Sequence, residues 1–456
     1  MRPLIALLAV LPLGAQESPG PLAREIFRQL IEINTTDSVG DNTRAAEAMA
    51  ARFREAGYPA GDIHVDGPAP RKGNLVARLR GTGAGRPILL IGHLDVVEAR
   101  REDWSFDPFV FREQDGYFYG RGAQDMKGDD AILVTAFLRM KRDGFQPARD
   151  LILALTSDEE GGPHNGISWL LEKHRDWIDA EFCVNSDAGG GHIKNGRRSF
   201  MSVQAAEKVF VSFLFESTNS GGHSSLPVKD NAIYHLAGAL TRLAQFDFPV
   251  RLFDVTRANF ARLAGIYGGT LGADMLAVTQ NPNDAAAVAR LSASPLYNAL
   301  LRTTCVATML AGGHAENALP QSATATVNCR MLPVDNAEDV QRTLERVAAD
   351  PKVRISVKTP AKSSPFAPMN PKVLSAVTAA TAKHWPGLPV VPVMETGATD
   401  GLYLRSAGIP TYGVSGIFAD EDDVRAHGRD ERILVQSFDD AIGFMYDVVT
   451  ALAKTD

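Results

Sequence analysis

The sequence predicts an α/β protein in which helices cover both faces of a mainly parallel sheet, with a smaller α+β domain inserted into it. Short apolar runs typical of buried strands, such as 87–92 and 150–156, alternate with helical patterns such as 131–141. Polar residues directly follow several of these runs, at the carboxyl ends of strands, where open α/β sheets keep their sites. The insertion is predicted by a change of pattern near residue 207.

The inserted domain is expected over 207–362, between the two parts of the first domain, 20–206 and 363–456. Half-exposed strands and amphipathic helices follow one another in it in the order strand, helix, strand, strand, helix, strand. The stretch 249–297 interrupts this order with weak periodicity, and we expect a partly helical insertion there. A last helix over 437–454 closes the first domain.

The composition indicates a globular protein that does not bind nucleic acid. With 456 residues, 45% of them hydrophobic and 22% charged, the chain is long enough for two domains and a large core. The formal net charge is −7, and acidic and basic residues are mixed without a basic stripe. After residue 20, no stretch is apolar enough to span a membrane, so we expect no membrane span.

Residues 1–15 resemble a secretory signal peptide. Arg2 is followed by a short apolar core and small residues, and a polar segment begins at Gln16. This pattern predicts an exported protein, either periplasmic or secreted. The alternative is a buried N-terminal helix.

The three cysteines do not form a metal or redox motif. An odd count without C-x-x-C spacing argues against a disulfide framework. Cys183, Cys305 and Cys329 are each expected to pack as small apolar residues. In an oxidising compartment Cys305 can instead bridge to Cys329.

A set of histidines and carboxylates follows the predicted strands or lies in glycine-rich loops, and its chemistry suits a pair of zinc ions. Two imidazoles with three carboxylates supply the nitrogen and oxygen ligands that zinc accepts, and one carboxylate can bridge ions about 3.5–4 Å apart. Asp95 is expected to hold the second ring nitrogen of His93 and so orient it. The predicted ligands are His93, Asp125, Glu160, Asp187 and His427.

Six motifs together resemble one known family. They are GHLDV at 92–96, GRGAQDMKG at 120–128, DEEGG at 158–162, NSD at 185–187, GHSSLP at 222–227 and AHGRDE at 426–431. The chain is similar to the di-zinc exopeptidases and amidohydrolases that include aminoacylase-1, the carnosinases, glutamate carboxypeptidase and succinyl-diaminopimelate desuccinylase. It looks closest to the branch of the Gly-X carboxypeptidase.

The resemblance implies a role for each ligand. Asp125 would bridge two zinc ions per subunit, with Co²⁺ or Mn²⁺ as possible substitutes. His93 and Asp187 would complete one metal site, and Glu160 and His427 the other. Glu159 would be the general base that takes a proton from the metal-activated water and passes it to the leaving amine. The family also has a cis peptide after the bridging aspartate, which would be the Asp125–Met126 bond.

The resemblance also implies that the inserted domain is a lid and a dimerisation domain. His223 would reach the site of a partner subunit in a homodimer; the alternative is a loop residue that caps the following helix. Arg330 would pair with a substrate carboxylate, although a structural salt bridge is an alternative. Asn317, Gly397 and Thr399 would contact the substrate. We expect the remaining glycine-flanked histidines to be loop residues, namely His164, His192 and His314.

The expected function is zinc-dependent cleavage of the amide bond to the C-terminal amino acid of a small peptide or an N-blocked amino acid. Within the same class, the alternatives are an N-acyl-amino-acid deacylase and a dipeptidase that needs a free amine. A non-catalytic binding domain on the same scaffold is disfavoured, because all five ligand positions and Glu159 are present.

Overall fold

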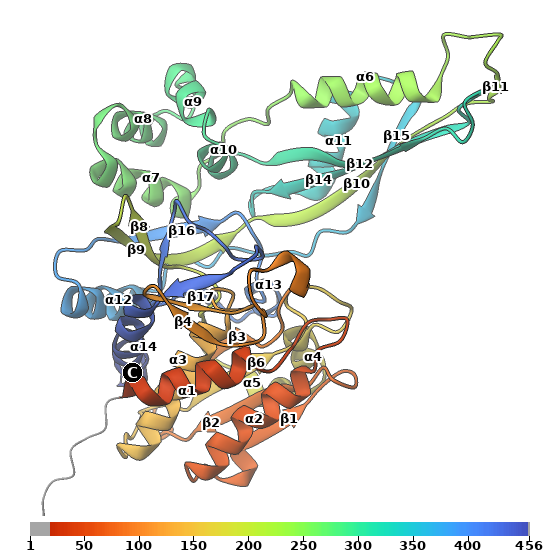
Figure 1. The fold of residues 1–456 in the computed structure, drawn as a ribbon. Coiled ribbons are helices and arrows are strands. Elements are labelled where there is room, and N and C mark those ends of the chain that lie inside the picture. Colours follow the sequence, from red (N-terminus) through yellow and green to blue (C-terminus); the bar gives the residue numbers. More distant parts are fainter. Residues whose placement is uncertain (1–18, 455–456) are drawn as a thin grey trace, which may run out of the picture.

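A computed structural model describes residues 19–454, so the signal peptide expected over 1–15 lies outside the described residues. The main body is a ten-stranded mixed sheet with helices on both faces, as expected (Figure 1). Its strands run in the order β1-β2-β6-β3-β7-β17-β9-β8-β18, and β16 also pairs with β9. The strand bounds are β1 Ile63–Asp66, β2 Asn74–Leu79, β3 Ile88–His93, β6 Leu151–Thr156, β7 Phe182–Asn185, β8 Gly190–Lys194, β9 Arg197–Glu207, β16 Val390–Glu395, β17 Thr411–Gly413 and β18 Phe418–Asp420.

The central strands β6, β3, β7 and β17 are parallel, and their sequences explain why they lie in the middle. Every residue of β3 and β6 is buried, because apolar side chains point to both faces of the sheet. Leu90 packs towards α3 on one face, and its neighbours Leu89 and Ile91 pack towards α4 and α13 on the other. The helices on the two faces are α1 Pro19–Ile31, α2 Asn42–Glu55, α3 Lys127–Arg142, α12 Pro371–His384 and α14 Val435–Lys454, against α4 Gly166–Lys173, α5 Arg175–Ile178 and α13 Gly401–Ser406.

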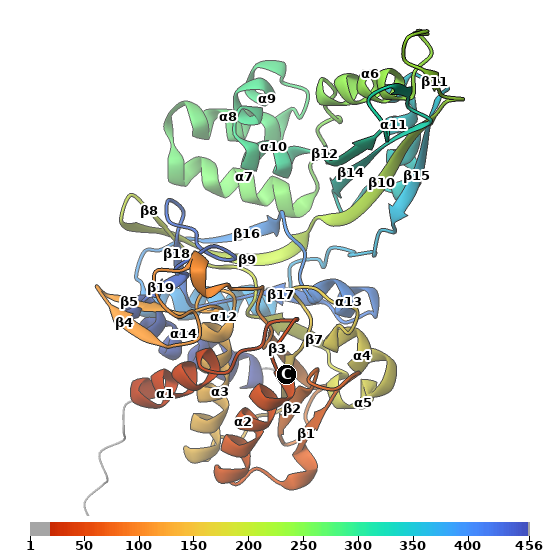
Figure 2. The same ribbon diagram turned by 45° about the vertical axis from the view of Figure 1, so that its right-hand side comes forward.

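A second, four-stranded antiparallel sheet projects from the main body (Figure 2). Its strand order is β12-β14-β10-β15, and two helices cover one face through an apolar core of its own. The chain forms this unit in the order β10, α6, β12, β14, α11, β15, which is the order expected from the sequence. The bounds are β10 Val209–Thr218, α6 Ala232–Ala244, β12 Thr304–Gly312, β14 Ser322–Met331, α11 Ala337–Ala348 and β15 Val353–Thr359.

The helices of the predicted insertion pack on the large sheet and not on the small one. They are α7 Asp254–Tyr267, α8 Gly269–Gln280, α9 Ala285–Ser292 and α10 Pro295–Leu301. Phe260 and Leu263 of α7 belong to the same apolar core as Val391 and Met394 of β16. Figure 2 shows these helices above β16, β9 and β8.

Two minor sheets complete the structure. β11 Gly222–His223 pairs with β13 Ala318–Leu319 at the end of the small sheet, and β19 Arg432–Leu434, β5 Tyr117–Tyr119 and β4 Arg112–Gln114 form a three-stranded sheet. Cys305 and Cys329 face each other across β12 and β14 and are joined by a disulfide, while Cys183 is a buried free thiol. None of the helices between residues 19 and 454 has the length and apolarity needed to cross a membrane.

Candidate active site

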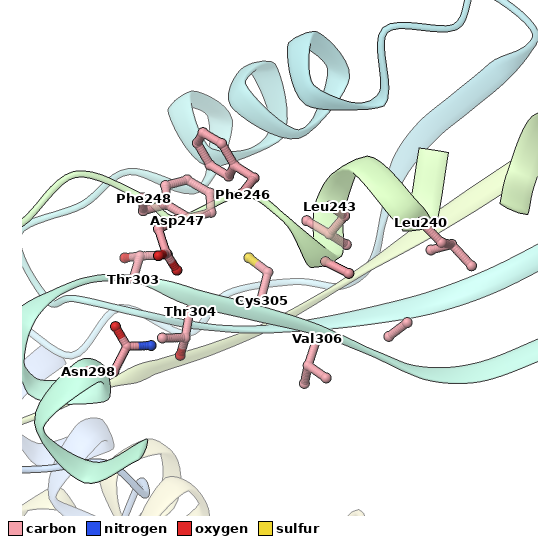
Figure 3. A pocket seen from close by; sticks show the side chains of 12 residues that line it. Leu240, Leu243, Phe246, Asp247, Phe248, Asn298, Thr303, Thr304, Cys305 and Val306 are labelled. Atoms are coloured by element: carbon pink, nitrogen blue, oxygen red, sulfur yellow. The ribbon is translucent and has the colours of Figure 1, made fainter. Parts of the chain in front are cut away.

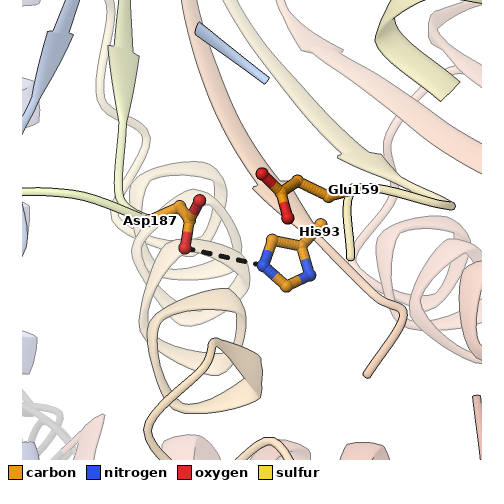
Figure 4. A group of neighbouring side chains, drawn as sticks. All are labelled: His93, Glu159 and Asp187. Atoms are coloured by element: carbon orange, nitrogen blue, oxygen red, sulfur yellow. Dashed lines mark ion pairs between the residues drawn. The ribbon is translucent and has the colours of Figure 1, made fainter. Parts of the chain in front are cut away.

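The predicted metal ligands meet where parallel strands of the large sheet end. His93 is the last residue of β3, Glu159 and Glu160 lie just beyond β6, and Asp187 lies just beyond β7. Because β6, β3 and β7 are parallel neighbours, their carboxyl ends lie side by side at one edge. Figure 4 shows His93, Glu159 and Asp187 converging on one point.

His93 is buried and oriented for metal binding. Its Nδ1 lies 3.0 Å from the main-chain oxygen of Asp95, so this nitrogen donates its hydrogen there. The other nitrogen, Nε2, lies 3.1 Å from Oδ1 of Asp125 and 3.5 Å from Oδ1 of Asp187. An imidazole nitrogen that faces two carboxylates must carry a proton or a metal ion, because a bare lone pair would be repelled by them. In the metal-free protein, against the opposing effect of burial, these carboxylates raise the pKa of His93 well above its usual range. The arrangement therefore fits a bound metal ion.

His427 completes a second group around the other oxygen of Asp125. Its Nε2 lies 3.1 Å from Oδ2 of Asp125 and 2.8 Å from Oε2 of Glu160. The two oxygens of Asp125 thus face two different histidines, which is the layout of a carboxylate that bridges two ions. The Asp125–Met126 peptide bond is cis, as the resemblance implied.

The donor atoms lie close enough together to hold metal. Two overlapping groups each have their ligand atoms within 4.8 Å of one another: His93, Glu159 and Asp187, and His93, Asp125 and Glu160. Without metal, burial raises the pKa of Asp187 to about 7. Burial, followed by the charge of Asp187, raises the pKa of Glu159 well above its usual range. Crowded carboxylates of this kind are relieved by divalent cations, so the residues fit a metal centre.

The carboxylate of Asp95 has different partners from the one predicted from the sequence. Its main-chain oxygen, and not its carboxylate, accepts the hydrogen of His93 Nδ1; the carboxylate Oδ1 is 3.7 Å from that nitrogen. The carboxylate instead accepts the main-chain N–H groups of Glu159 at 3.1 Å and Glu160 at 2.9 Å. Asp95 therefore fixes the loop that carries the predicted base and one predicted ligand.

Glu431 is a positioning residue that sequence reasoning missed. Its buried carboxylate accepts the main-chain N–H groups of Gly122, Gln124 and Asp125 at 2.7–3.0 Å. Arg121 donates to it at 2.6 Å and also reaches the main-chain oxygen of Gly428 at 2.9 Å. The pair ties the Asp125 loop to the His427 loop. Its presence in the motif at 426–431 was the available signal, but the contact itself spans about three hundred residues of chain.

A cavity of about 950 Å³ opens over the metal ligands. Three of the predicted substrate-binding residues line it: Arg330, Gly397 and Thr399. Thr399 donates through its main-chain N–H and its hydroxyl to Glu207, which pairs with Arg405 in the interior. The loop at 397–400 is thereby held against the end of β9. The lining residues that were not predicted include three with larger side chains, Phe210, Thr359 and Glu395.

Arg330 has no partner among residues 19–454 that would make it a structural salt bridge. It lies opposite Phe210 in the β10–β14 ladder, and its guanidinium is 4.9 Å from the centre of that ring. Burial lowers the pKa of Arg330, and no carboxylate nearby compensates for this.

His223 and Asn317 do not line the cavity of their own chain. The main-chain N–H of Ser224 donates to the main-chain oxygen of Asn317, and His223 pairs with Ala318. His223 and Asn317 are therefore neighbours at the exposed end of the small sheet. Figure 1 shows this end, marked by β11, remote from β3. The side chain of Asn231, and not His223, caps α6.

One of the three histidines expected in loops is elsewhere. His192 lies within β8, where its ring contacts Ser202 at 3.1 Å and Glu421 at 3.4 Å. The glycines before it concealed the strand, because glycine is typical of turns. His164 and His314 lie outside helices and strands.

A separate pocket of about 420 Å³ lies between the end of α6 and the start of β12 (Figure 3). It is lined largely by apolar side chains such as Leu243, Phe246 and Phe248. Asp247 is its one charged lining residue, so this pocket lacks the ligands of a metal centre.

Comparison with known proteins identifies the family. The sequence model of peptidase family M20/M25/M40 matches residues 89–451. The human N-fatty-acyl-amino acid synthase/hydrolase PM20D1 is 28% identical over 377 residues, covering 80% of this chain and 74% of that protein. Aminoacylase-1 of Mus musculus is 25% identical over 437 residues, covering 94% and 95% of the two chains.

Solved structures share the fold. An M20 family metallo-carboxypeptidase from Sulfolobus solfataricus has a TM-score of 0.68 at 17% identity, covering 94% of this chain and 99% of that one. Human carnosine dipeptidase 1 has a TM-score of 0.64 at 16% identity, covering 95% and 96%. The shared fold agrees with the family match, which covers most of the chain. The chain therefore belongs to peptidase family M20/M25/M40, whose members are hydrolases of amide bonds.

Proposed function

We propose that the protein is a zinc-dependent exopeptidase or amidohydrolase that cleaves the amide bond to a C-terminal amino acid. Its substrate would be a small peptide or an N-acyl amino acid. The observation that carries the proposal is Arg330, an unpaired guanidinium that lines the same cavity as the metal ligands. A guanidinium binds a carboxylate through two parallel hydrogen bonds. Burying the guanidinium without such a partner is unfavourable.

The metal centre would hold two zinc ions, with Asp125 between them, His93 and Asp187 on one side, and Glu160 and His427 on the other. When bound, the ions polarise the scissile carbonyl and lower the pKa of a water molecule. The distances around the two oxygens of Asp125 support this assignment.

Glu159 would act as general base and then as general acid towards the leaving amine. It lines the cavity beside Glu160, and Asp95 fixes its main chain. Adjacent carboxylates can perform different tasks here, because Glu160 would serve as a metal ligand while Glu159 would remain free to exchange protons.

The surface of the small sheet supports a homodimer. β12 is an edge strand, and Val306, Met309 and Leu310 on it are 61%, 63% and 72% exposed. A long exposed apolar edge is a surface that a second copy can cover. His223, exposed at the end of the same sheet, would then donate to the oxyanion in the partner's cavity.

Export is also a proposal. It is supported by the signal-peptide pattern at 1–15 and by the disulfide between Cys305 and Cys329, because disulfides persist in oxidising compartments.

Two alternatives within the class remain open to a direct test. The names of PM20D1 and aminoacylase-1 point to N-acyl amino acids as the substrates of those relatives, whereas carnosine dipeptidase acts on a dipeptide. The deciding experiment measures amine release from a free dipeptide and from its N-acylated form, each with and without a chelator. A C-terminally amidated version is the control. Cleavage that is abolished by both the chelator and amidation supports the proposal; cleavage of the amidated form contradicts it.

A further inference from the structure

The cavity over the predicted metal ligands contains a further unpaired charge besides Arg330. Glu395 is the last residue of β16, is partly buried, and lines the cavity together with Arg330. Among residues 19–454, no lysine, arginine or histidine nitrogen lies within 4.0 Å of its carboxylate as an ion pair, and it does not pair with Arg330.

The other charged groups of the cavity have partners or a role in the predicted chemistry. The carboxylates of Asp125, Glu160 and Asp187 face histidines and would be bound by metal ions. Glu159, the predicted base, has no ion pair among residues 19–454 either. Among the described residues, Arg330 and Glu395 are therefore the cation and the anion on the walls that have neither an ion-pair partner nor a role in the predicted metal chemistry. Burial raises the pKa of Glu395, so its ionised form would be stabilised by a positive charge brought into the cavity.

We propose that Glu395 binds a cationic nitrogen of the substrate, so that preferred substrates carry a positive charge as well as the carboxylate held by Arg330. This inference rests on the proposed function, because it assumes that a C-terminal carboxylate occupies Arg330. The nitrogen is an ammonium or guanidinium group, supplied either by a free α-amine or by a basic side chain.

The competing explanation is that Glu395 only positions the neighbouring main chain. Two substitutions distinguish this role from binding of a cation. The main chain of Gly189 donates a hydrogen bond to the carboxylate, and Gly189 is two residues beyond the predicted ligand Asp187. Glu395→Gln keeps an oxygen that can accept this hydrogen bond but removes the charge. Glu395→Ala removes both.

The experiment compares kcat/KM for three substrates with the same C-terminal leucine: Ala-Leu, N-acetyl-Ala-Leu and N-acetyl-Lys-Leu. It uses the metal-loaded full chain as wild type, Glu395→Gln and Glu395→Ala. Glu338→Gln, an exposed acid on α11, is the matched charge control. Metal content is measured for each variant.

We expect wild type to prefer Ala-Leu or N-acetyl-Lys-Leu over N-acetyl-Ala-Leu by about tenfold to a hundredfold, the range of a hydrogen bond to a charged group. Glu395→Gln should bring that ratio close to one, with little change for N-acetyl-Ala-Leu, and Glu338→Gln should leave it unchanged. The preferred substrate identifies the source of the cation.

An unchanged ratio in Glu395→Gln would overturn the inference. So would an equal loss on all three substrates in Glu395→Ala with none in Glu395→Gln, because that result indicates positioning through Gly189. If wild type cleaves neutral and cationic substrates equally well, only this inference fails. If it cleaves none of the three, the proposed function fails as well.

Discussion

The two sheets of the molecule carry different parts of the predicted chemistry. Strand ends of the large sheet and the loops of Asp125 and His427 bring together all five predicted metal ligands and Glu159 within one chain. The distances between the histidine nitrogens and the ligand carboxylates are 2.8–3.5 Å. The small sheet contributes Arg330 to the cavity, but its far end leaves His223 and the edge strand β12 exposed. The difference between the two sheets indicates that one chain can bring together the predicted metal ligands. The roles proposed for Arg330 and His223 depend in addition on how the small sheet is placed.

The largest effect should come from the large sheet. Glu159→Ala should lower kcat by about 10²–10⁴-fold, because proton transfer loses its base. The metal content should stay at the wild-type value, measured by atomic spectroscopy, whereas Glu160→Ala should lose metal. Glu172→Ala, on the exposed side of α4, is the control. Loss of metal from Glu159→Ala would show that Glu159 is a ligand and not the base.

The next largest effect concerns His223 of the small sheet, which we propose acts in the cavity of the partner subunit. His223→Ala should lower kcat by about 10²–10³-fold, the usual cost of losing an oxyanion donor. Mixing it with inactive Glu159→Ala and allowing subunits to exchange should restore activity, because a mixed dimer contains one cavity with both groups intact. If native mass spectrometry detects mixed dimers but activity does not return, His223 does not act across the interface.

A further test concerns Arg330. Arg330→Ala should lower kcat/KM by about tenfold to a hundredfold for substrates with a free C-terminal carboxylate, since a charged hydrogen-bonded pair is lost. Arg330→Lys should recover part of the loss, because a point charge replaces a fork-shaped donor. Arg197→Ala, an exposed arginine in β9, is the control. If Arg330→Ala lowered kcat/KM equally for C-terminally amidated substrates, Arg330 would not be the residue that binds the carboxylate.

The smallest expected signal is proton release on metal binding. Hydrogen bonds from His427 to Asp125 and then Glu160 raise the pKa of His427 to about 10 in the metal-free protein. His427 is therefore protonated at pH 8, and a metal ion must displace that proton to reach the nitrogen.

The affinity for metal should accordingly rise with pH up to about 10. His93 should lose a proton on metal binding as well, because, against the opposing effect of burial, the charge of Asp187 and the hydrogen bond with Asp125 raise the pKa of His93 well above its usual range. Asp187, whose pKa burial raises to about 7, should add a further proton below pH 7. Calorimetry in two buffers with different ionisation heats measures the number of protons released. Metal binding without proton release would contradict the placement of His427 as a ligand.

The sequence predicted the parts of the site that follow from local pattern. His93 and Asp187 were found because an apolar strand ends beside each, and parallel strand ends meet. The fold class was predicted for the same reason, since the buried runs of β3 and β6 carry their own signature.

The contacts between distant segments were out of reach of the sequence. The carboxylate of Asp95 was assigned to His93 but hydrogen-bonds the Glu159 loop, a contact that depends on a loop conformation. Glu431 and Glu395 were missed because their neighbours lie far away in the chain. Predicting the bond between Cys305 and Cys329 would have required the register of β12 on β14, which no local sequence pattern determines.

The carboxylate of Glu431, which joins the Asp125 loop to the His427 loop, has a consequence for biosynthesis. A ribosome-bound chain that has not reached residue 427 lacks one predicted ligand and the group that shapes the loop around another. Such a nascent chain cannot assemble the complete centre, however well its earlier strands have folded. Products terminated before residue 427 should be equally inert, so hydrolytic activity would appear only after residues 427–431 have been synthesised and have folded onto the Asp125 loop.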